Sequence, residues 1–287
     1  MKNILKVVFV IIGALVGAGF ASGKEIYSFF FIYGKFGIIG LIISSLIISM
    51  VIYNVLKICS TNNINTYHDF CNIIGNYKFS KLLNNIVNIF LLLSFYVMIA
   101  GFSSFLNQEF NVNKILGSLI IILSCFCVFQ KNINGLMKIS NYLIPILIIF
   151  IIYVALKNIN IFENYNSNFK ENNIFLPIIK SIIKAVLYAC YNCVILIPVI
   201  IPISTKSREN RNIFAISGIC FSTLLMLSLA VYNLLLQGDT SIFNLEMPII
   251  GVVSKYGVFH KISYIFIIGI AIFTSAASSG LRIFKQF

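Results

Sequence analysis

The sequence contains few charged residues. Of its 287 residues, 10% are charged and 59% are hydrophobic, and Asp and Glu together number only 8. A water-soluble domain carries about 25% charged and 45–50% apolar residues. This shortage of charge excludes a soluble enzyme, a nucleic-acid-binding module and a disordered chain. The sequence is that of an integral membrane protein, and we expect it to contact a lipid bilayer and no nucleic acid.

Residue combinations that carry catalysis are also missing. The apolar segments hold no Ser/His/Asp set and no paired carboxylates, and the two histidines, His68 and His260, lie near predicted loops. Cys190-x-x-Cys193 has no second ligand pair and is typical of helix packing. Seven cysteines are an odd number, so they cannot all pair within the chain. We therefore expect neither an enzyme nor a cofactor.

Long hydrophobic runs fill most of the chain. Because one transmembrane helix takes about 20 apolar residues, the chain has room for about eight spans. The predicted spans are 4–33, 36–57, 82–106, 115–130, 139–156, 176–201, 212–236 and 258–283. No polar linker separates two soluble domains, so residues 1–287 form a single predicted transmembrane domain. Residues 248–253, within a hydrophilic stretch, are expected to form a short re-entrant or capping helix.

Basic residues predict the orientation. The formal net charge is +13, and Lys and Arg gather on cytoplasmic loops. With the N-terminus inside, 12 of them fall on the cytoplasmic side and 7 outside. We expect a multi-pass protein of the cell membrane with a cytoplasmic N-terminus. Lys180 and Lys184, within the sixth span, either snorkel to the outer interface or act in an electrostatic funnel or a pair with Glu25.

Two predicted spans contain residues that interrupt helices. In the sixth, Pro198 and Pro202 follow the segment Tyr188–Cys193 and disfavour a straight helix. The first span carries four glycines, which weaken a helix by up to about 1 kcal/mol each relative to alanine: Gly13, Gly17, Gly19 and Gly23. These glycines form either a small-residue packing face or an unwound segment that binds a solute and a cation. Broken helices at matching positions of two halves are typical of transporters.

The glycine-rich segment carries a family resemblance. Residues 12–26, IGALVGAGFASGKEI, resemble the GAGFASGxEI signature of the bacterial YkvI family. That family is a branch of the amino acid–polyamine–cation superfamily and is regarded as a family of candidate amino-acid permeases. Residues 188–192, YACYN, resemble its sixth-span motif.

The resemblance implies the leucine-transporter fold. This is an all-α membrane fold with an inverted repeat and broken helices 1 and 6. The first five-helix repeat would cover residues 1–157, and a partial second repeat would cover 174–287. The fold has ten spans or more, whereas this sequence has about eight. Either the second repeat is incomplete or the chain is truncated.

A cation site is implied by the same resemblance. In the leucine transporter, carbonyls at the positions of Gly13 and Val16 bind sodium, together with ligands at the positions of Ala271, Thr274 and Ser275. Hydroxyls in transmembrane helices usually bond to their own backbone. Hard cations nevertheless prefer oxygen ligands, which hydroxyls and freed carbonyls supply without a buried carboxylate. We expect these five residues to hold the ion.

One Na⁺, rather than H⁺ or two Na⁺, is the expected coupling ion. An asparagine that helps hold a second sodium in the leucine transporter is Phe20 here. Proton-coupled relatives place a lysine from the fifth span near the ion site. The fifth span here, Ser140–Leu156, has no ionisable side chain except Tyr142 and Tyr153.

The implied function is secondary active transport of a small amino acid or related solute by alternating access around a midplane site. The substrate carboxylate would meet backbone N–H groups near Ala18 and Gly19. Four side chains would shape the pocket, unless Tyr191 and Asn192 merely pack: Tyr96, Tyr188, Tyr191 and Asn192. The rival interpretation is a non-transporting receptor or sensor that binds an amino acid in the same pocket, and an intramembrane enzyme is third. The sequence gives no oligomeric state.

Overall fold

In the computed structural model, helices are the only regular secondary structure of the described residues. The structure describes residues 2–157, 175–204, 209–238, 241–245 and 247–286, and these ranges contain no strand. The all-helical prediction is therefore confirmed. The segment between the two expected repeats, residues 158–173, lies outside the described residues together with residue 174. So do Lys170, Lys206 and Arg208, which entered the prediction of orientation.

Each predicted span after the first is one continuous helix. In lipid every backbone polar group must be paired within the protein, so a long apolar run forms an unbroken helix. Six described helices are long and apolar enough to cross a membrane, and two shorter apolar helices, Ile4–Leu15 and Lys114–Phe129, accompany them. The continuous helices are α4 (Gly37–Thr61), α6 (Tyr77–Phe110), α7 (Lys114–Phe129), α8 (Asn132–Lys157), α9 (Phe175–Ser204), α10 (Asn210–Leu236) and α12 (Val258–Gln286).

The first span is broken, as its glycines predicted. It consists of α1 (Lys2–Leu15), α2 (Ala18–Ala21), α3 (Lys24–Phe29) and the 3₁₀ helix η1 (Phe31–Phe36). The first interruption lies at residues 16–17, and the second lies at Ser22 and Gly23. Gly23 has φ 81°, a left-handed conformation that glycine adopts without steric cost.

The sixth span is not broken, which corrects the prediction of a break there. Helix α9 continues from Phe175 to Ser204 with Pro198 and Pro202 inside it. Each proline removes one backbone donor, and a transmembrane helix tolerates this loss where neighbouring helices surround it. Here α9 packs against α4, α1, α3, α5, α6 and α12. This packing surrounds the helix through the segment where the sequence indicated an interruption.

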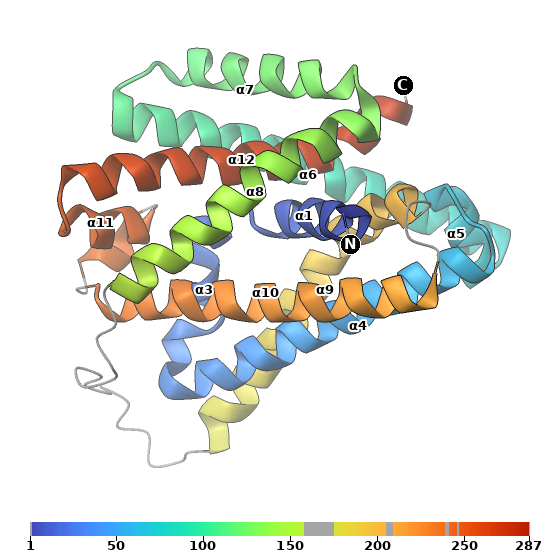
Figure 1. The fold of residues 1–287 in the computed structure, drawn as a ribbon, viewed down its shortest axis with the longest axis horizontal. Coiled ribbons are helices and arrows are strands. Elements are labelled where there is room, and N and C mark those ends of the chain that lie inside the picture. The colour runs from blue at the N-terminus through green and yellow to red at the C-terminus, as the bar shows by residue number, and fades with distance from the viewer. Residues whose placement is uncertain (1, 158–174, 205–208, 239–240, 246, 287) are drawn as a thin grey trace.

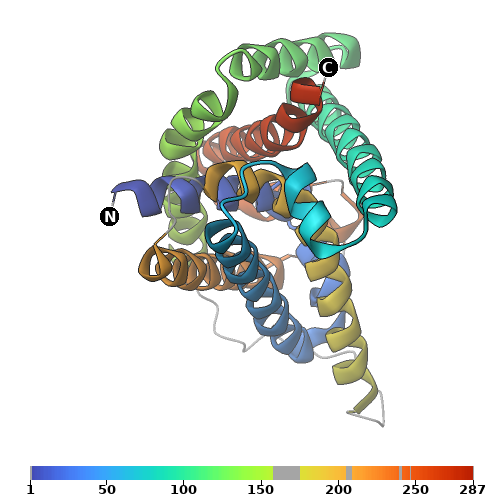
Figure 2. The ribbon, with the colours of Figure 1, turned by 90° about the vertical axis from the view of Figure 1, so that its right-hand side faces the viewer.

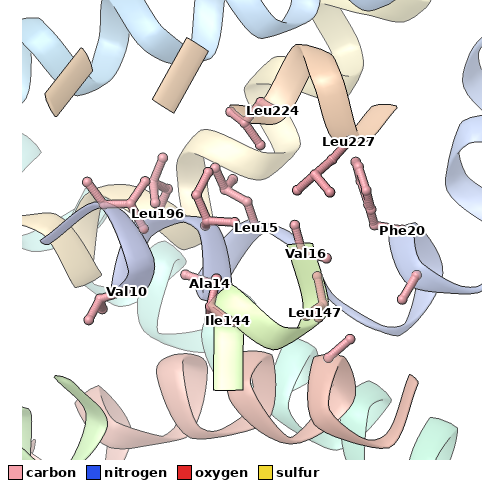
Figure 3. Packing of buried hydrophobic residues seen from close by; sticks show 14 of the residues in the cluster. Val10, Ala14, Leu15, Val16, Phe20, Ile144, Leu147, Leu196, Leu224 and Leu227 are labelled. Atoms are coloured by element: carbon pink, nitrogen blue, oxygen red, sulfur yellow. The ribbon is translucent and has the colours of Figure 1, made fainter. Parts of the chain in front are cut away.

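Helix α1 lies at the centre of the fold. It packs against α8, α9, α10 and α12, and Figures 1 and 2 show these helices around it. Figure 3 shows Leu15, the last residue of α1, and Val16 after it among Ile144, Leu196 and Leu227, which come from three of the surrounding helices. The interruption of the first span is therefore enclosed in the core.

Apolar side chains also cover the outside of the helices. Val97 is 63% exposed, and Ile115 and Ile149 are each 68% exposed. Such a surface is costly in water, where exposed apolar patches of this extent are rare. It fits a multi-pass membrane protein, whose outer faces contact lipid.

Three short helices lie in the hydrophilic stretches: α5 (Tyr67–Ile74), η2 (Ile242–Asn244) and α11 (Pro248–Ser254). Helix α11 confirms the predicted helix at residues 248–253, whereas α5 was not predicted. Ile249 N donates to Ser22 O at 3.1 Å, and Tyr264 Oη of α12 donates to Ala21 O at 2.7 Å. Helix α11 thus caps the second interruption of the first span.

Candidate functional site

The interruption after α1 frees backbone oxygen atoms in the core. In a continuous helix Gly17 N would donate to Gly13 O. Here it donates instead to Leu15 O at 3.1 Å. The carbonyl of Gly13 is therefore released from its helical partner, and Val16, the next residue after α1, is fully buried. Buried carbonyls at membrane depth need another partner.

Ser275 of α12 supplies that partner. Its hydroxyl lies 3.1 Å from Gly13 O and 3.2 Å from Val16 O, and the serine is 5% exposed. A single hydroxyl hydrogen reaches two acceptors only in a shared, weaker geometry. The structure thus brings together three of the five predicted cation ligands, which are 259 and 262 residues apart in the sequence.

The other two predicted ligands lie on the same helix. Ala271 and Thr274 are both fully buried. The Thr274 hydroxyl donates within α12, to Ile270 O at 3.0 Å and to Ala271 O at 3.1 Å. Thr274 therefore follows the ordinary pattern of a hydroxyl in a transmembrane helix. It lies beside Ser275 in sequence and adds an oxygen that a cation could recruit by rotation of one side chain.

Helix α8 closes the other side of this oxygen cluster. A Cβ on Gly13 would lie 3.0 Å from Ile144 Cδ1 and 3.7 Å from Ser140 Oγ. Ser140 is fully buried, and its hydroxyl has no hydrogen-bond partner in the part of the chain that the structure describes. Ser140 is thus a further unsatisfied oxygen beside Gly13, and sequence reasoning did not select it.

The first span also carries a buried carboxylate, Glu25 on α3. Its Oε1 accepts from Tyr191 Oη of α9 at 3.2 Å, and the Tyr188 hydroxyl also lies beside it. A Cβ on Gly19 would lie 2.7 Å from Glu25 Cγ, so the glycine makes room for this side chain. Of the predicted substrate-binding residues, Gly19, Tyr188 and Tyr191 therefore meet around Glu25.

Asn192 faces its own helix. Its Nδ2 donates to Tyr188 O at 2.9 Å, and the residue is 3% exposed. With Tyr188 and Phe20 it lines a cavity of about 10 Å³, which is room for about one water molecule. This hydrogen bond within α9 fits the interpretation in which Asn192 packs inside the protein rather than binding substrate.

Tyr96 and Ala18 lie apart from this group of residues. Tyr96 is 60% exposed on α6 and so points away from the core. Ala18 is partly buried, and its Cβ would lie 3.9 Å from a Cβ on Gly101 of α6. Ala18 therefore faces α6, while the next residue, Gly19, faces Glu25.

A larger cavity leads toward the oxygen cluster from one end of the helices. Its volume is about 310 Å³, within the range of small-molecule sites. It is lined by residues of α5, α6, α8, α9 and α12, including His68, Pro198, Pro202 and Ser278. The Ser278 hydroxyl donates to Thr274 O at 2.8 Å. The cavity therefore ends one helical turn from the predicted cation ligands.

One signal for Glu25 was present in the sequence. It is the only acidic residue inside any of the predicted spans, and intramembrane ionisable residues are functional candidates because they are expensive to bury. Sequence reasoning considered it only as a partner of Lys180 or Lys184. In the structure Lys184 Nζ lies over the ring of Phe29, 5.7 Å from its centroid, and Glu25 contacts Tyr191 instead.

Comparison with known proteins supports a relationship to YkvI. The chain is 24% identical over 282 residues to the uncharacterized membrane protein YkvI of Bacillus subtilis (strain 168), covering 97% of this chain and 79% of that protein. It is also 27% identical over 153 residues to the uncharacterized protein YyaD of the same organism, covering 53% of this chain and 44% of that protein. No protein-family model matches the chain.

Proposed function

We propose that this protein is a secondary active transporter of a small amino acid or related solute, coupled to one Na⁺ and working in the cell membrane with its N-terminus in the cytoplasm. The observation that carries the proposal is the contact of Ser275 with the carbonyls of Gly13 and Val16 at the break of the first span. It joins two segments from opposite ends of the chain around a set of buried oxygen atoms.

The chemistry of this set suits Na⁺. Carbonyl and hydroxyl oxygens are the ligands that hard cations prefer. Gly13, Val16 and Ala271 would contribute carbonyls, and Thr274 and Ser275 would turn hydroxyl lone pairs toward the ion. These five ligands carry no net charge. Helix α8 places the hydroxyl of Ser140 beside Gly13, where proton-coupled relatives place the ammonium group of a lysine. An ion held here would link α1 to α12.

Na⁺ would drive transport by favouring one state of the protein. A ligand shifts a conformational equilibrium only by its different affinity for the two states. The site exists only while α12 touches the broken end of α1, so Na⁺ stabilises the state in which these two segments meet. The substrate carboxylate would then meet backbone N–H groups at Ala18 and Gly19, beside the same break.

The two ends of the site differ in access, which supports alternating access. On one side α11 caps the first span through Ile249 N and Ser22 O. On the other side the cavity of about 310 Å³ reaches Ser278. With the proposed orientation, this cavity opens to the cytoplasm and is the release route.

Cysteine labelling tests this route. In a background with the exposed Cys127 and Cys190 replaced by serine, Ser278→Cys is expected to react with a water-soluble thiosulfonate reagent, and Na⁺ plus amino acid should slow the reaction. Ser279→Cys is the matched control, because Ser279 is equally buried on α12 and donates within its own helix. Equal labelling of the two variants would contradict the route.

Transport itself is tested in vesicles. The purified protein is reconstituted into liposomes, and accumulation of each of the twenty amino acids is measured with inward Na⁺ or K⁺ gradients. We expect accumulation of at least one amino acid with Na⁺ only. Na⁺-dependent binding in a thermal-shift screen without accumulation would instead identify the receptor or sensor. If Na⁺ changes neither binding nor uptake, the proposed coupling is wrong.

A further inference from the structure

Glu25 is a buried carboxylate with one oxygen unused. Its Oε2 is shielded from solvent and has no hydrogen-bond partner among the described residues, whereas Oε1 accepts from Tyr191 Oη at 3.2 Å. Burying a carboxylate is costly unless it is paired and hydrogen-bonded. Among the described residues, Lys261 forms an ion pair with Glu109, and Glu25 forms no ion pair. Within the part of the chain that the structure describes, Glu25 Oε2 is thus an acceptor without a hydrogen-bond donor, although the Tyr188 hydroxyl lies beside the carboxylate.

The surroundings of Glu25 are aromatic. Tyr188 packs edge-on against Phe29 and Phe30, with ring centroids 5.2 Å apart in both pairs. It also lies 6.1 Å from the Tyr191 ring. Aromatic faces attract organic ammonium groups. A bare metal cation instead takes a shell of oxygen ligands, which aromatic rings do not supply.

Gly19 leaves room for the Glu25 side chain. A Cβ at this position would lie 2.7 Å from Glu25 Cγ and 2.8 Å from Cδ, closer than real Cβ contacts. Gly19 belongs to α2, which directly follows the interruption at residues 16–17. The carboxylate of Glu25, with Oε1 nearest to Gly19, is therefore packed against the segment that we propose to contact the substrate.

We propose that Glu25, with Tyr191, binds the ammonium group of the transported solute. This inference rests on the proposed function and names its substrate class: a solute that carries a primary ammonium group. Glu25 Oε2 accepts from the ammonium, Tyr191 keeps the carboxylate in place through Oε1, and the tyrosine rings shield the pair from water. An α-amino acid carries its carboxylate next to its ammonium, which matches recognition by Gly19 N–H and Glu25 side by side.

Paired ligands and variants test the inference. Binding of the twenty amino acids, ethylamine and propionate to the full chain in detergent is measured by thermal shift and by equilibrium binding. Glu25→Gln keeps the shape and an acceptor for Tyr191 but removes the charge. We expect it to weaken binding of every ligand that carries an ammonium by at least about tenfold, the usual loss for a charge-assisted hydrogen bond.

A second variant and a control separate the loss of the Glu25 charge from other effects of substitution. Gly19→Ala forces the Glu25 carboxylate aside and is expected to weaken the same ligands without removing any charge. Glu109→Gln removes the carboxylate that pairs with Lys261 and is expected to leave the affinities unchanged. Stabilisation by Na⁺ alone, measured without amino acid, is expected to survive Glu25→Gln.

The outcomes separate this inference from the proposed function. If Glu25→Gln keeps the affinity for amino acids within about twofold, or if it abolishes stabilisation by Na⁺ alone, ammonium recognition by Glu25 is wrong while Na⁺-coupled transport stands. If ethylamine binds in a Glu25-dependent way but no amino acid does, the inference stands and amino-acid transport fails. Binding of propionate that exceeds all ammonium ligands overturns the inference.

Discussion

Replacing both Thr274 and Ser275 by alanine is expected to abolish the Na⁺ dependence of amino-acid binding. Ser275 is the side chain that contacts Gly13 O and Val16 O. Ser275→Ala alone should therefore raise the Na⁺ concentration at which amino-acid binding is half-maximal by at least about tenfold. This is the size of effect expected when one polar contact to a charged group is lost. Thr274→Ala should have a smaller effect, because Thr274 donates within α12.

The measurement is the difference in melting temperature and in amino-acid affinity between NaCl and KCl. A difference is needed because Ser275→Ala also leaves two buried carbonyls without their partner, which costs about 1–3 kcal/mol per unsatisfied group in either salt. Ser279→Ala is the control: Ser279 is buried one turn further along α12, and its hydroxyl donates to Ser275 O. A double variant that still responds to Na⁺ as the unmutated protein does would show that the ion binds elsewhere.

Gly23→Ala is expected to destabilise the protein more than Gly13→Ala or Gly17→Ala in the same span. Gly23 has φ 81°, and a non-glycine residue held in a sparsely populated backbone region costs about 1–3 kcal/mol. Its new Cβ would lie 2.7 Å from Ile249 Cγ1 of α11, and overpacking adds about 1–3 kcal/mol. The new methyl group would displace α11 from Ser22, whose carbonyl accepts a hydrogen bond from Ile249 N.

Gly218→Ala provides the matched control for this change. Gly218 lies inside α10, and a Cβ there would meet no atom within 4 Å. Alanine in a helix interior is favoured over glycine by up to about 1 kcal/mol, so Gly218→Ala should leave the melting temperature unchanged or raise it. Unfolding in detergent is followed by circular dichroism. Equal melting temperatures for the two variants would contradict both claims about Gly23: that its positive φ requires glycine, and that α11 packs too closely on it to admit a methyl group.

The positions of the helices could be predicted because their cause is local. Apolar runs of sufficient length form helices in lipid whatever surrounds them, and the predicted spans after the first all correspond to helices. The break at residues 16–17 was also predictable, because Gly17 and Gly19 weaken the helix at that point. The pairing of Ser275 with Gly13 and Val16 followed from resemblance, since nothing in either segment alone specifies the other.

The break predicted in the sixth span was wrong for a physical reason. Pro198 and Pro202 were taken to interrupt the helix near Tyr191, but both lie in the last two turns of α9. A proline removes one donor and can kink a helix without ending it, and neighbouring helices pack around α9. Local propensity predicted an interruption, and tertiary packing overrode it.

The sequence by itself determined a multi-pass helical membrane protein, because its low charge and its long apolar runs require a lipid environment rather than water. It also determined the weak point of the first span. Only the tertiary structure placed Glu25 against Tyr191 across 166 residues, seated α11 on Ser22, and kept α9 whole. These features depend on which helix faces meet, and long-range packing rather than local backbone preference decides that.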